Sequence, residues 1–236
     1  MTSVNPRPTA VLLPGTGSDE VFVRSVFARP LAALGIELIT PAPPRGTAVV
    51  AGTMALVDDL ARTVSGPLLV GGISLGAHLA TDWALGNPGR CAGVLAALPA
   101  WHGEPGHAPA AVAARACADL VDRAGLDTAL ATATHGVAPW LAAELDRAWR
   151  RHGDTLPASL RAAAAHPAPE PVRLRTLEVP VGIAACADDP VHPLAAAQVW
   201  AGALPRARVC ETTLEAFGAD REAVGRAAVL AWLRAR

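Results

Sequence analysis

The sequence predicts an α/β fold with a mostly parallel sheet of about six strands, helices on both faces and a helical cap inserted in the chain. Short apolar runs alternate with stretches of helical periodicity, which is typical of strands joined by helical crossovers. The runs are continuously apolar rather than alternating, as in strands that are buried on both faces of a parallel sheet. One long interval without a strand candidate indicates the cap.

Six short apolar runs are the strand candidates. Thr9–Leu13 is a buried strand that ends at Pro14, and Ile36–Thr40 is a second one that ends at Pro41. The other four candidates are Leu68–Gly71, Ala92–Leu98, Val181–Ala185 and Arg208–Thr212. Helical periodicity between these strands predicts the helices Val21–Leu34, Thr53–Val64, Leu75–Leu85, Leu194–Leu204 and Arg221–Leu233.

Residues 101–177 interrupt this alternation of strands and helices, because they contain only helical segments separated by glycine and proline. These segments are Ala110–Ala124, Pro139–His152 and Pro157–Ala165. The interval is too long for one crossover between neighbouring strands. We therefore predict a single α/β domain over residues 1–236, with residues 101–177 forming a helical cap over one end of the sheet.

The composition excludes several classes of function. The 236 residues include 20 Lys+Arg and 21 Asp+Glu, a net charge of -1, which argues against nucleic acid or an anionic membrane as a partner. All the basic residues are arginine, and tyrosine is absent. Schiff-base lysine, phosphate-loop lysine and tyrosine acid–base chemistry are thereby excluded.

The sequence also indicates a cytoplasmic protein without a metal or a cofactor. The first eight residues are polar and broken by proline, unlike a signal peptide, and no apolar run of about 18 residues is present. The four cysteines are scattered without a C-x-x-C pair, which favours buried thiols over a metal site. Gly15-Thr16-Gly17 does not continue as a dinucleotide loop, because Glu20 occupies the place of the third glycine.

The motif that carries chemistry is Gly72-x-Ser74-x-Gly76. An apolar strand leads directly into it and an alanine-rich helix leaves it, which is the context of a nucleophile elbow. In such a turn the serine hydroxyl is exposed at the carboxyl end of the sheet and at a helix N-terminus, where negative charge is favoured. Ser74 is therefore the candidate nucleophile.

With this motif the chain resembles the α/β-hydrolase superfamily over most of its length. Leu12-Leu13-Pro14-Gly15-Thr16-Gly17-Ser18 is similar to that family's first oxyanion loop, with proline in place of the usual histidine. The resemblance implies that the backbone N–H groups of Thr16 and Leu75 form an oxyanion hole. Losing one such donor costs about 3–4 kcal/mol in other enzymes.

A third segment, Cys186-Ala187-Asp188-Asp189-Pro190-Val191-His192-Pro193, follows the predicted strand Val181–Ala185. It is similar to the family's acid loop, in which an aspartate directly before proline orients the catalytic histidine. The resemblance assigns that role to Asp189 and leaves Asp188 as an exposed or loop-capping carboxylate. The order of nucleophile before acid also matches the family.

The family's histidine follows the last strand, but no histidine lies beyond His192 in this chain. His192 and His102 both follow predicted strands at the same edge of the sheet. We favour His192 as the base, because it lies in the acid loop. The alternatives are His102 and no histidine base at all. Glu215 and Asp220 occupy the late loop, but an ionised carboxylate is a weak base.

The remaining histidines and the aromatic residues of the insertion suggest lesser roles. His78 lies one turn into the elbow helix and is expected to pack beside the sheet. Exposure is expected for three histidines of the insertion, which are His107, His135 and His152. The cluster formed by Arg147, Arg150, Arg151 and His152 is expected to be a solvated helix end. Packing in the core is the commoner role for tryptophan, and the alternative is that Trp101, Trp140 and Trp149 line an apolar pocket.

Three functions fit these patterns. The first is a small serine hydrolase of esterase or thioesterase type, acting through Ser74, Asp189, His192 and the N–H groups of Thr16 and Leu75 on a neutral or apolar acyl compound. The second is a protein that keeps the fold but only binds a small apolar ligand or a partner. The third is a cofactor-independent lyase or isomerase.

Overall fold

The sheet has six parallel strands in the order β2-β1-β3-β4-β5-β6. The computed structural model describes residues 8–236, so the expectation for the first seven residues lies outside the described part. The strands are β1 (Thr9–Leu13), β2 (Glu37–Ile39), β3 (Leu68–Ile73), β4 (Cys91–Ala97), β5 (Val181–Cys186) and β6 (Ala207–Thr212). This arrangement confirms the predicted fold class.

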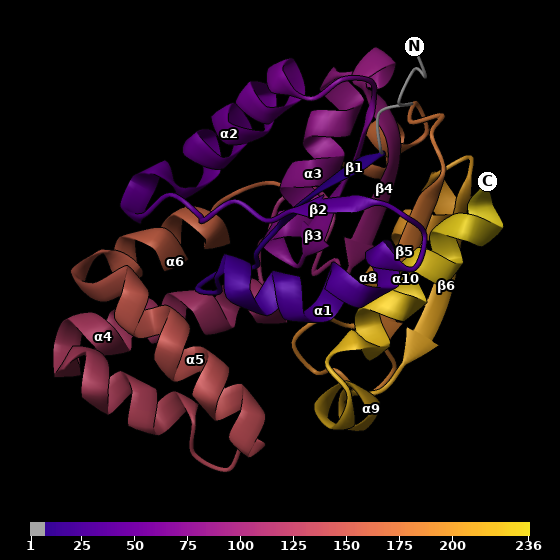
Figure 1. Ribbon diagram of the computed structural model, residues 1–236. Coiled ribbons are helices and arrows are strands. Elements are labelled where there is room, and N and C mark those ends of the chain that lie inside the picture. The colour runs from indigo at the N-terminus through magenta and orange to yellow at the C-terminus, as the bar shows by residue number, and fades with distance from the viewer. Residues whose placement is uncertain (1–7) are drawn as a thin grey trace.

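Two layers of helices cover the sheet (Figure 1). The helices between or after neighbouring strands are α1 (Glu20–Ala32), α2 (Val49–Thr63), α3 (Leu75–Gly86), α8 (Leu194–Ala203), α9 (Leu214–Ala219) and α10 (Glu222–Ala235). Phe27 of α1 and Trp232 of α10 pack with Leu12 and Leu95 on one face. On the other face, α2, α3 and α8 pack their apolar side chains against the alternate residues of the same strands.

The strand order reverses direction between β1 and β3. The chain runs from β1 outward to β2 and then returns to β3 on the other side of β1. Helix α1 therefore leaves β1 toward one face of the sheet, and α3 leaves β3 toward the other. In parallel α/β sheets, the crevice outside the carboxyl ends of two such strands is the usual place for ligands.

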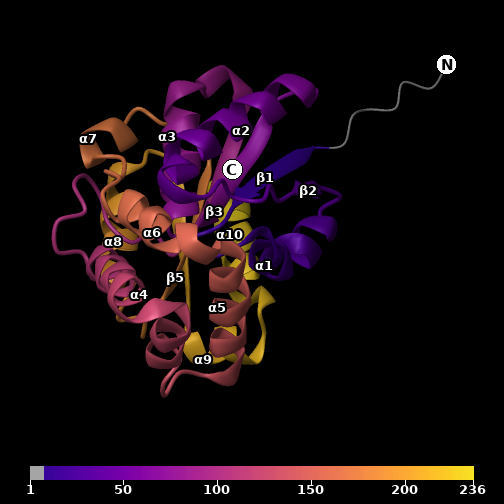
Figure 2. The same cartoon turned by 90° about the vertical axis from the view of Figure 1, so that its left-hand side faces the viewer.

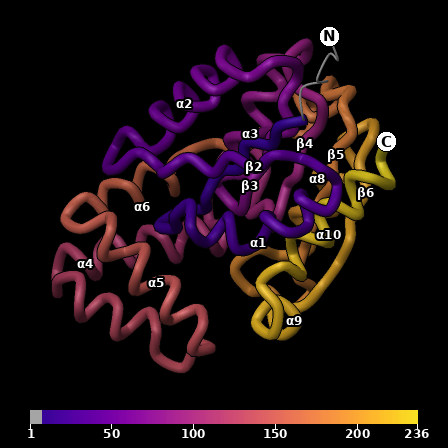
Figure 3. The backbone as a smooth tube through the Cα atoms, viewed as in Figure 1, coloured from indigo at the N-terminus to yellow at the C-terminus, as the bar shows by residue number. Residues whose placement is uncertain are grey.

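The segment between β4 and β5 forms four helices, which are α4 (Pro109–Ala133), α5 (Pro139–His152), α6 (Leu156–Ala164) and α7 (Pro171–Leu174). Helices α4, α5 and α6 group beside the end of the sheet toward which the strand arrows point (Figures 1 and 2). Their buried residues form a separate apolar cluster that includes Leu130, Trp149 and Leu160. Figure 3 shows the chain passing through these helices before it returns to β5.

The short 3₁₀ segments complete the described elements. They are η1 (Gly46–Ala48), η2 (Pro88–Arg90) and η3 (Gly153–Thr155). Helix α6 packs against η1 and α2, so the insertion also contacts the sheet-covering helices. Within residues 8–236, no helix is both long enough and apolar enough to cross a membrane.

The predicted strands are confirmed to within two residues at each end. The inner strands β1, β3 and β5 are apolar runs that are buried throughout, whereas the edge strands β2 and β6 include the exposed residues Glu37, Arg208 and Glu211. Helices α7 and α9 were not predicted, since both are too short to show a period. Helix α4 extends past the predicted end at Ala124, and the chain kinks at Gly125, where φ is 80° and ψ is 165°.

Candidate active site

Ser74 occupies the turn between β3 and α3 in a strained backbone conformation. Its φ is 55° and its ψ is -115°, values that few residues with a side chain adopt. Its N–H donates to the carbonyl of Ala97 at 2.9 Å, and its own carbonyl accepts from the N–H groups of Ala77 and His78. These bonds tie the turn to β4 and to the first turn of α3, and so hold the serine in this conformation.

The two glycines of the motif are required by close backbone contact. A Cβ at Gly76 would lie 2.8 Å from the carbonyl oxygen of Pro14 and still closer to that of Leu13. A Cβ at Gly72 would lie 2.8 Å from the carbonyl carbon of Gly76. Both distances are shorter than ordinary van der Waals contact, so only glycine allows β1, β3 and α3 to converge at the serine.

Asp189 lies in the loop between β5 and α8 and is buried, with 9% of its surface exposed. Its Oδ1 accepts the backbone N–H groups of Val191 at 2.8 Å and His192 at 3.1 Å. Burial raises the pKa of the Asp189 carboxyl, but hydrogen bonds and charge from His192, with the two backbone bonds, outweigh it. The pKa of Asp189 consequently lies below its ordinary value, and the group is a carboxylate at neutral pH.

His192 joins Asp189 to Ser74. Its Nδ1 is 2.8 Å from Asp189 Oδ2, and its Nε2 is 3.0 Å from Ser74 Oγ. Because a carboxylate only accepts hydrogen bonds, Nδ1 carries the proton, and Nε2 is then the acceptor for the serine hydroxyl. The structure thus brings all three side chains of the predicted set together in one chain of hydrogen bonds.

The loop after β1 lies directly beside this serine. A Cβ at Gly15 would stand 3.4 Å from the Cβ of Ser74 and 3.1 Å from the carbonyl oxygen of Ile73. Thr16 is the next residue in this loop, and Leu75 is the first residue of α3. Across residues 8–236, neither the Thr16 N–H nor the Leu75 N–H has a backbone acceptor. Both amide donors are therefore without a backbone acceptor in this part of the chain.

The alternative bases lie elsewhere. His102 is exposed, and it makes no hydrogen bond to Ser74 in the described structure. Glu215 is exposed on α9, and Asp220 pairs with Arg226. Asp188, expected to be an exposed or capping carboxylate, accepts the N–H of Leu214 at 2.7 Å, close to the start of α9.

Two further titratable groups lie close to the site and stay uncharged. His78 is fully buried, and its Nε2 accepts the N–H of Ala100 at 3.0 Å. Burial lowers the pKa of His78 to about 3, so the imidazole is neutral. Burial, with smaller contributions from Asp189 and Asp188, raises the pKa of the Cys186 thiol to about 12. Cys186 is therefore not a thiolate nucleophile.

The expectation of a solvated helix end holds for Arg150 and Arg151, which are exposed, but it is wrong for Arg147 and His152. His152 is only 5% exposed, and Arg147 binds the buried carboxylate of Asp19. An aspartate directly before a periodic segment is a helix N-cap signal, and Asp19 does accept the N–H of Phe22. Nothing in the local sequence relates Asp19 to an arginine 128 positions away, so the pairing was missed.

The three tryptophans of the insertion are in different surroundings. Trp101 contacts the ring of buried His78, and Trp149 packs in the apolar cluster of α4, α5 and α6. Trp140 stacks on Phe22, with the guanidinium of Arg221 3.8 Å from its ring. Among residues 8–236, no group of three or more His, Cys, Asp or Glu side chains is arranged to hold a metal ion.

The parallel sheet, the elbow and the acid loop define the α/β-hydrolase fold, and comparison with solved structures shows that the chain has it. It is similar to an enol-lactonase from Burkholderia xenovorans, with 16% identity, a TM-score of 0.70 and coverage of 92% of this chain and 90% of that chain. It is also similar to a thermophilic esterase from Thermogutta terrifontis, with 18% identity, a TM-score of 0.65 and coverage of 98% and 90%. A third similar structure is MenH from S. aureus, with 14% identity, a TM-score of 0.66 and coverage of 89% and 86%. No protein-family model and no curated protein sequence matches the chain.

Proposed function

We propose that this protein is a serine hydrolase of esterase or thioesterase type. The observation that carries the proposal is the continuous chain of hydrogen bonds from Ser74 through His192 to Asp189. A serine hydroxyl is a poor nucleophile unless a neighbouring base accepts its proton. Nε2 of His192 is in hydrogen-bonding distance of the Ser74 hydroxyl, and the Asp189 carboxylate orients the ring.

In the proposed reaction, Ser74 Oγ attacks the carbonyl carbon of the acyl substrate while its proton moves to His192 Nε2. The carbonyl oxygen becomes an oxyanion and is bound by the N–H groups of Thr16 and Leu75. The positive charge on His192 is stabilised by Asp189. Collapse of the intermediate breaks the bond to the alcohol or thiol, which leaves with the proton from His192. Water then repeats these steps on the acyl-enzyme, releasing the acid and restoring Ser74.

The substrate class of this proposal is a neutral or apolar acyl compound. The supporting observation is that buried apolar groups surround the loop beside Ser74, since Trp149 and Leu160 both pack on Gly17. We further propose that residues 101–177 act as a cap on the site. In support, α5 of this segment contacts residues 17–19, which directly follow Thr16.

The test is labelling of the purified protein with a fluorophosphonate probe, together with turnover of short-chain p-nitrophenyl esters and acyl thioesters. Wild-type protein is expected to bind one probe at Ser74 and to hydrolyse at least one of these substrates. Ser74→Ala is expected to lose the label and to reduce kcat/KM by about a thousandfold or more, since the attacking oxygen is removed.

Ser25→Ala is the matched control, because the Ser25 hydroxyl caps a carbonyl within the exposed part of α1 and lies outside the proposed machinery. It should label and turn over like wild type. A folded wild-type protein that takes no label would refute the proposal in favour of a binding function. Full activity in Ser74→Ala would instead indicate lyase or isomerase chemistry without an acyl-enzyme.

A further inference from the structure

We infer that helix α5 holds the oxyanion loop in place, and that Arg147 is a positioning residue for the Thr16 N–H. The inference rests on the proposed function and extends it to a residue far from Ser74 in the sequence. Three contacts join α5 to residues 17–19, which directly follow Thr16, and we call them together the α5–loop contact. Each is made by a different side chain of the last two turns of the helix: Arg147, Trp149 and His152.

The first contact is a two-bond ion pair between Arg147 and Asp19. Arg147 Nε donates to Asp19 Oδ2 at 2.9 Å, and Nη2 donates to Oδ1 at 2.8 Å. The Asp19 side chain is 3% exposed and also caps α1 through the N–H of Phe22. Because a buried carboxylate is costly without its partner, this pair sets the position of the residue at which the loop ends.

The other two contacts act on the loop itself. His152 Nε2 donates to the carbonyl of Ser18 at 3.3 Å. A Cβ at Gly17 would lie 3.1 Å from Trp149 Nε1 and 3.2 Å from Leu160, so the insertion packs tightly on this glycine. Gly17 has φ of 64°, a left-handed conformation that turns the chain between Thr16 and Ser18. The direction of the Thr16 N–H therefore depends on a backbone that α5 covers on one side.

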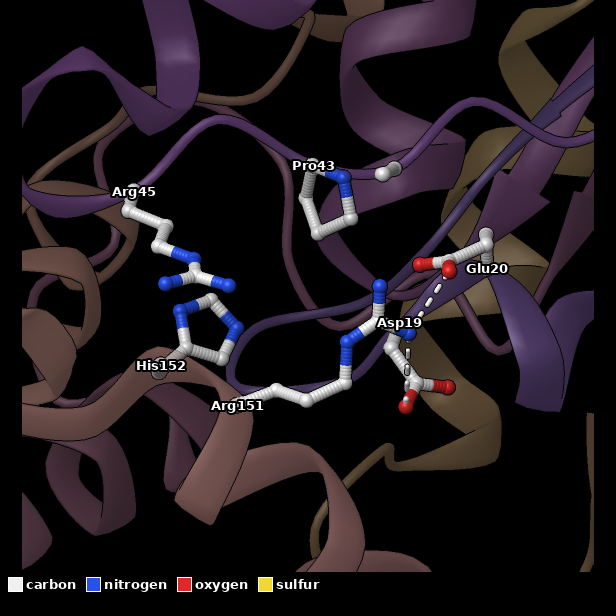
Figure 4. Close-up of a pocket in the computed structure, with 7 residues that line it drawn as sticks. Asp19, Glu20, Pro43, Arg45, Arg151 and His152 are labelled. Carbon is white, nitrogen blue, oxygen red and sulfur yellow. Dashed lines mark hydrogen bonds and ion pairs between the residues drawn. The ribbon is translucent and has the colours of Figure 1, made fainter.

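Further ion pairs beside the α5–loop contact join the end of α5 to the start of α1. Arg151 binds Glu20 at 2.6 Å and lies 3.9 Å from Asp19. Figure 4 shows Arg151 spanning the space between the end of α5 and the start of α1, with Arg45 beside His152. A cavity of about 80 Å³ lies between these side chains. The ion pairs thus come from both sides of one junction, and their loss separates α5 from the loop.

The experiment compares Arg147→Met with Arg150→Met in the full-length protein. Arg150 is on the same helix, but its partners Asp127 and Asp146 are exposed and belong to the insertion itself. We expect Arg147→Met to lower kcat for a p-nitrophenyl ester at least tenfold with KM changed less than twofold, because the displaced N–H acts on the oxyanion. Amide hydrogen exchange in residues 14–19 should become at least tenfold faster. Arg150→Met should match wild type in both measurements.

A double variant distinguishes the proposed positioning role of Arg147 from a purely structural role. Asp19→Asn combined with Arg147→Met removes the unpaired buried charge and keeps an N-cap side chain for Phe22. We expect its melting temperature to recover toward wild type while kcat stays at least tenfold low. Recovery of both would overturn the inference. Arg147→Lys, which keeps the charge but loses the second hydrogen bond, should regain part of kcat.

Failure of the inference and failure of the proposed function give different results. A wild-type protein that does not label with fluorophosphonate refutes the hydrolase proposal, and the exchange comparison then decides whether α5 orders the loop. A wild-type protein that labels, with wild-type kcat and wild-type exchange in Arg147→Met, refutes the positioning role and leaves the hydrolase proposal intact. If Arg147→Met does not fold, the double variant replaces it in every measurement.

Discussion

At the scale of single residues, the candidate site depends on one loop that supplies two of its three side chains, Asp189 and His192. Asp189 and His192 are only three positions apart, and Asp189 accepts two backbone N–H groups from the turn between them. This turn directs the imidazole back over the carboxylate and leaves Nε2 free to meet Ser74. A histidine after the last strand is therefore not needed to complete the hydrogen-bond chain.

Asp189→Asn tests this arrangement. The amide still accepts the backbone N–H groups, but it loses the charge that stabilises an imidazolium and selects the Nδ1–H tautomer. We expect kcat for ester hydrolysis to fall by about three to four orders of magnitude, with the melting temperature lowered by no more than a few degrees. Steady-state kinetics and thermal unfolding measure these two effects.

Asp188→Asn is the control, because Asp188 is the exposed neighbour and its amide replacement still accepts the N–H of Leu214. Its kcat should stay within twofold of wild type. Equal losses in the two variants would mean that the loop conformation, and not the Asp189–His192 pair, controls activity.

At the scale of elements, the insertion combines a kinked helix with a helix held by ion pairs. Helix α4 changes direction at Gly125, after which it packs with α5 and α6 around Leu130 and Trp149. Residues on both sides of the kink belong to this apolar cluster, among them Ala118 before Gly125 and Ala129 after it. Helix α5 then carries the α5–loop contact at its C-terminal end.

Gly125→Ala tests the kink. The observed φ of 80° and ψ of 165° belong to a region that is nearly exclusive to glycine, so alanine is expected to lower the free energy of unfolding by about 1–3 kcal/mol. No heavy atom lies within 4 Å of the added Cβ, so the effect comes from the backbone alone. Urea unfolding followed by circular dichroism measures it.

Gly202→Ala provides the matched comparison, since Gly202 lies in α8 with equally open space around it. There, alanine should raise the free energy of unfolding by about 0.5–1 kcal/mol, because it favours the helical backbone. The interpretation of the kink fails if the two variants shift stability in the same direction by similar amounts.

At the scale of the whole molecule, buried neutral histidines link stability to pH. His78 is packed between Trp101 and Trp200 under the site, and burial lowers its pKa to about 3. Burial also lowers the pKa of His152. In the unfolded chain these groups bind a proton near pH 6.5, so acid favours the unfolded state.

The predicted effect is a loss of stability on going from pH 6 to pH 5. Each neutral buried histidine contributes a decrease of about 1.4 kcal/mol in the free energy of unfolding per pH unit between its unfolded and folded pKa values. The carboxylates of Asp19 and Asp189 have lowered pKa values, so their stabilisation is lost only below about pH 4. Chemical denaturation at several pH values gives the slope.

His78→Gln should reduce this slope by about 1.4 kcal/mol per pH unit, because glutamine offers an acceptor to the Ala100 N–H and does not titrate in this range. His107→Gln serves as the control, since His107 is exposed. An unchanged slope in a folded His78→Gln protein would show that His78 is not the source of the acid sensitivity.

Much of the fold and several residues of the candidate site were predictable because the signals are local. A strand buried on both faces is a short apolar run, and an elbow requires glycine on each side of its serine where β1, β3 and α3 converge. Thr9–Leu13 and Gly72-x-Ser74-x-Gly76 show this directly. Helix α9, by contrast, is six residues long and has no period to detect.

The sequence by itself determined the strands, the elbow and the acid loop, since each of these depends on residues that are neighbours along the chain. Its composition alone excluded lysine and tyrosine chemistry. Only the tertiary structure decided that His192 and not His102 meets Ser74, and that Arg147 meets Asp19. These pairs join residues more than 100 positions apart. Their geometry follows from how the sheet brings β1, β3 and β5 to one edge and how α5 packs against that edge, which no local pattern contains.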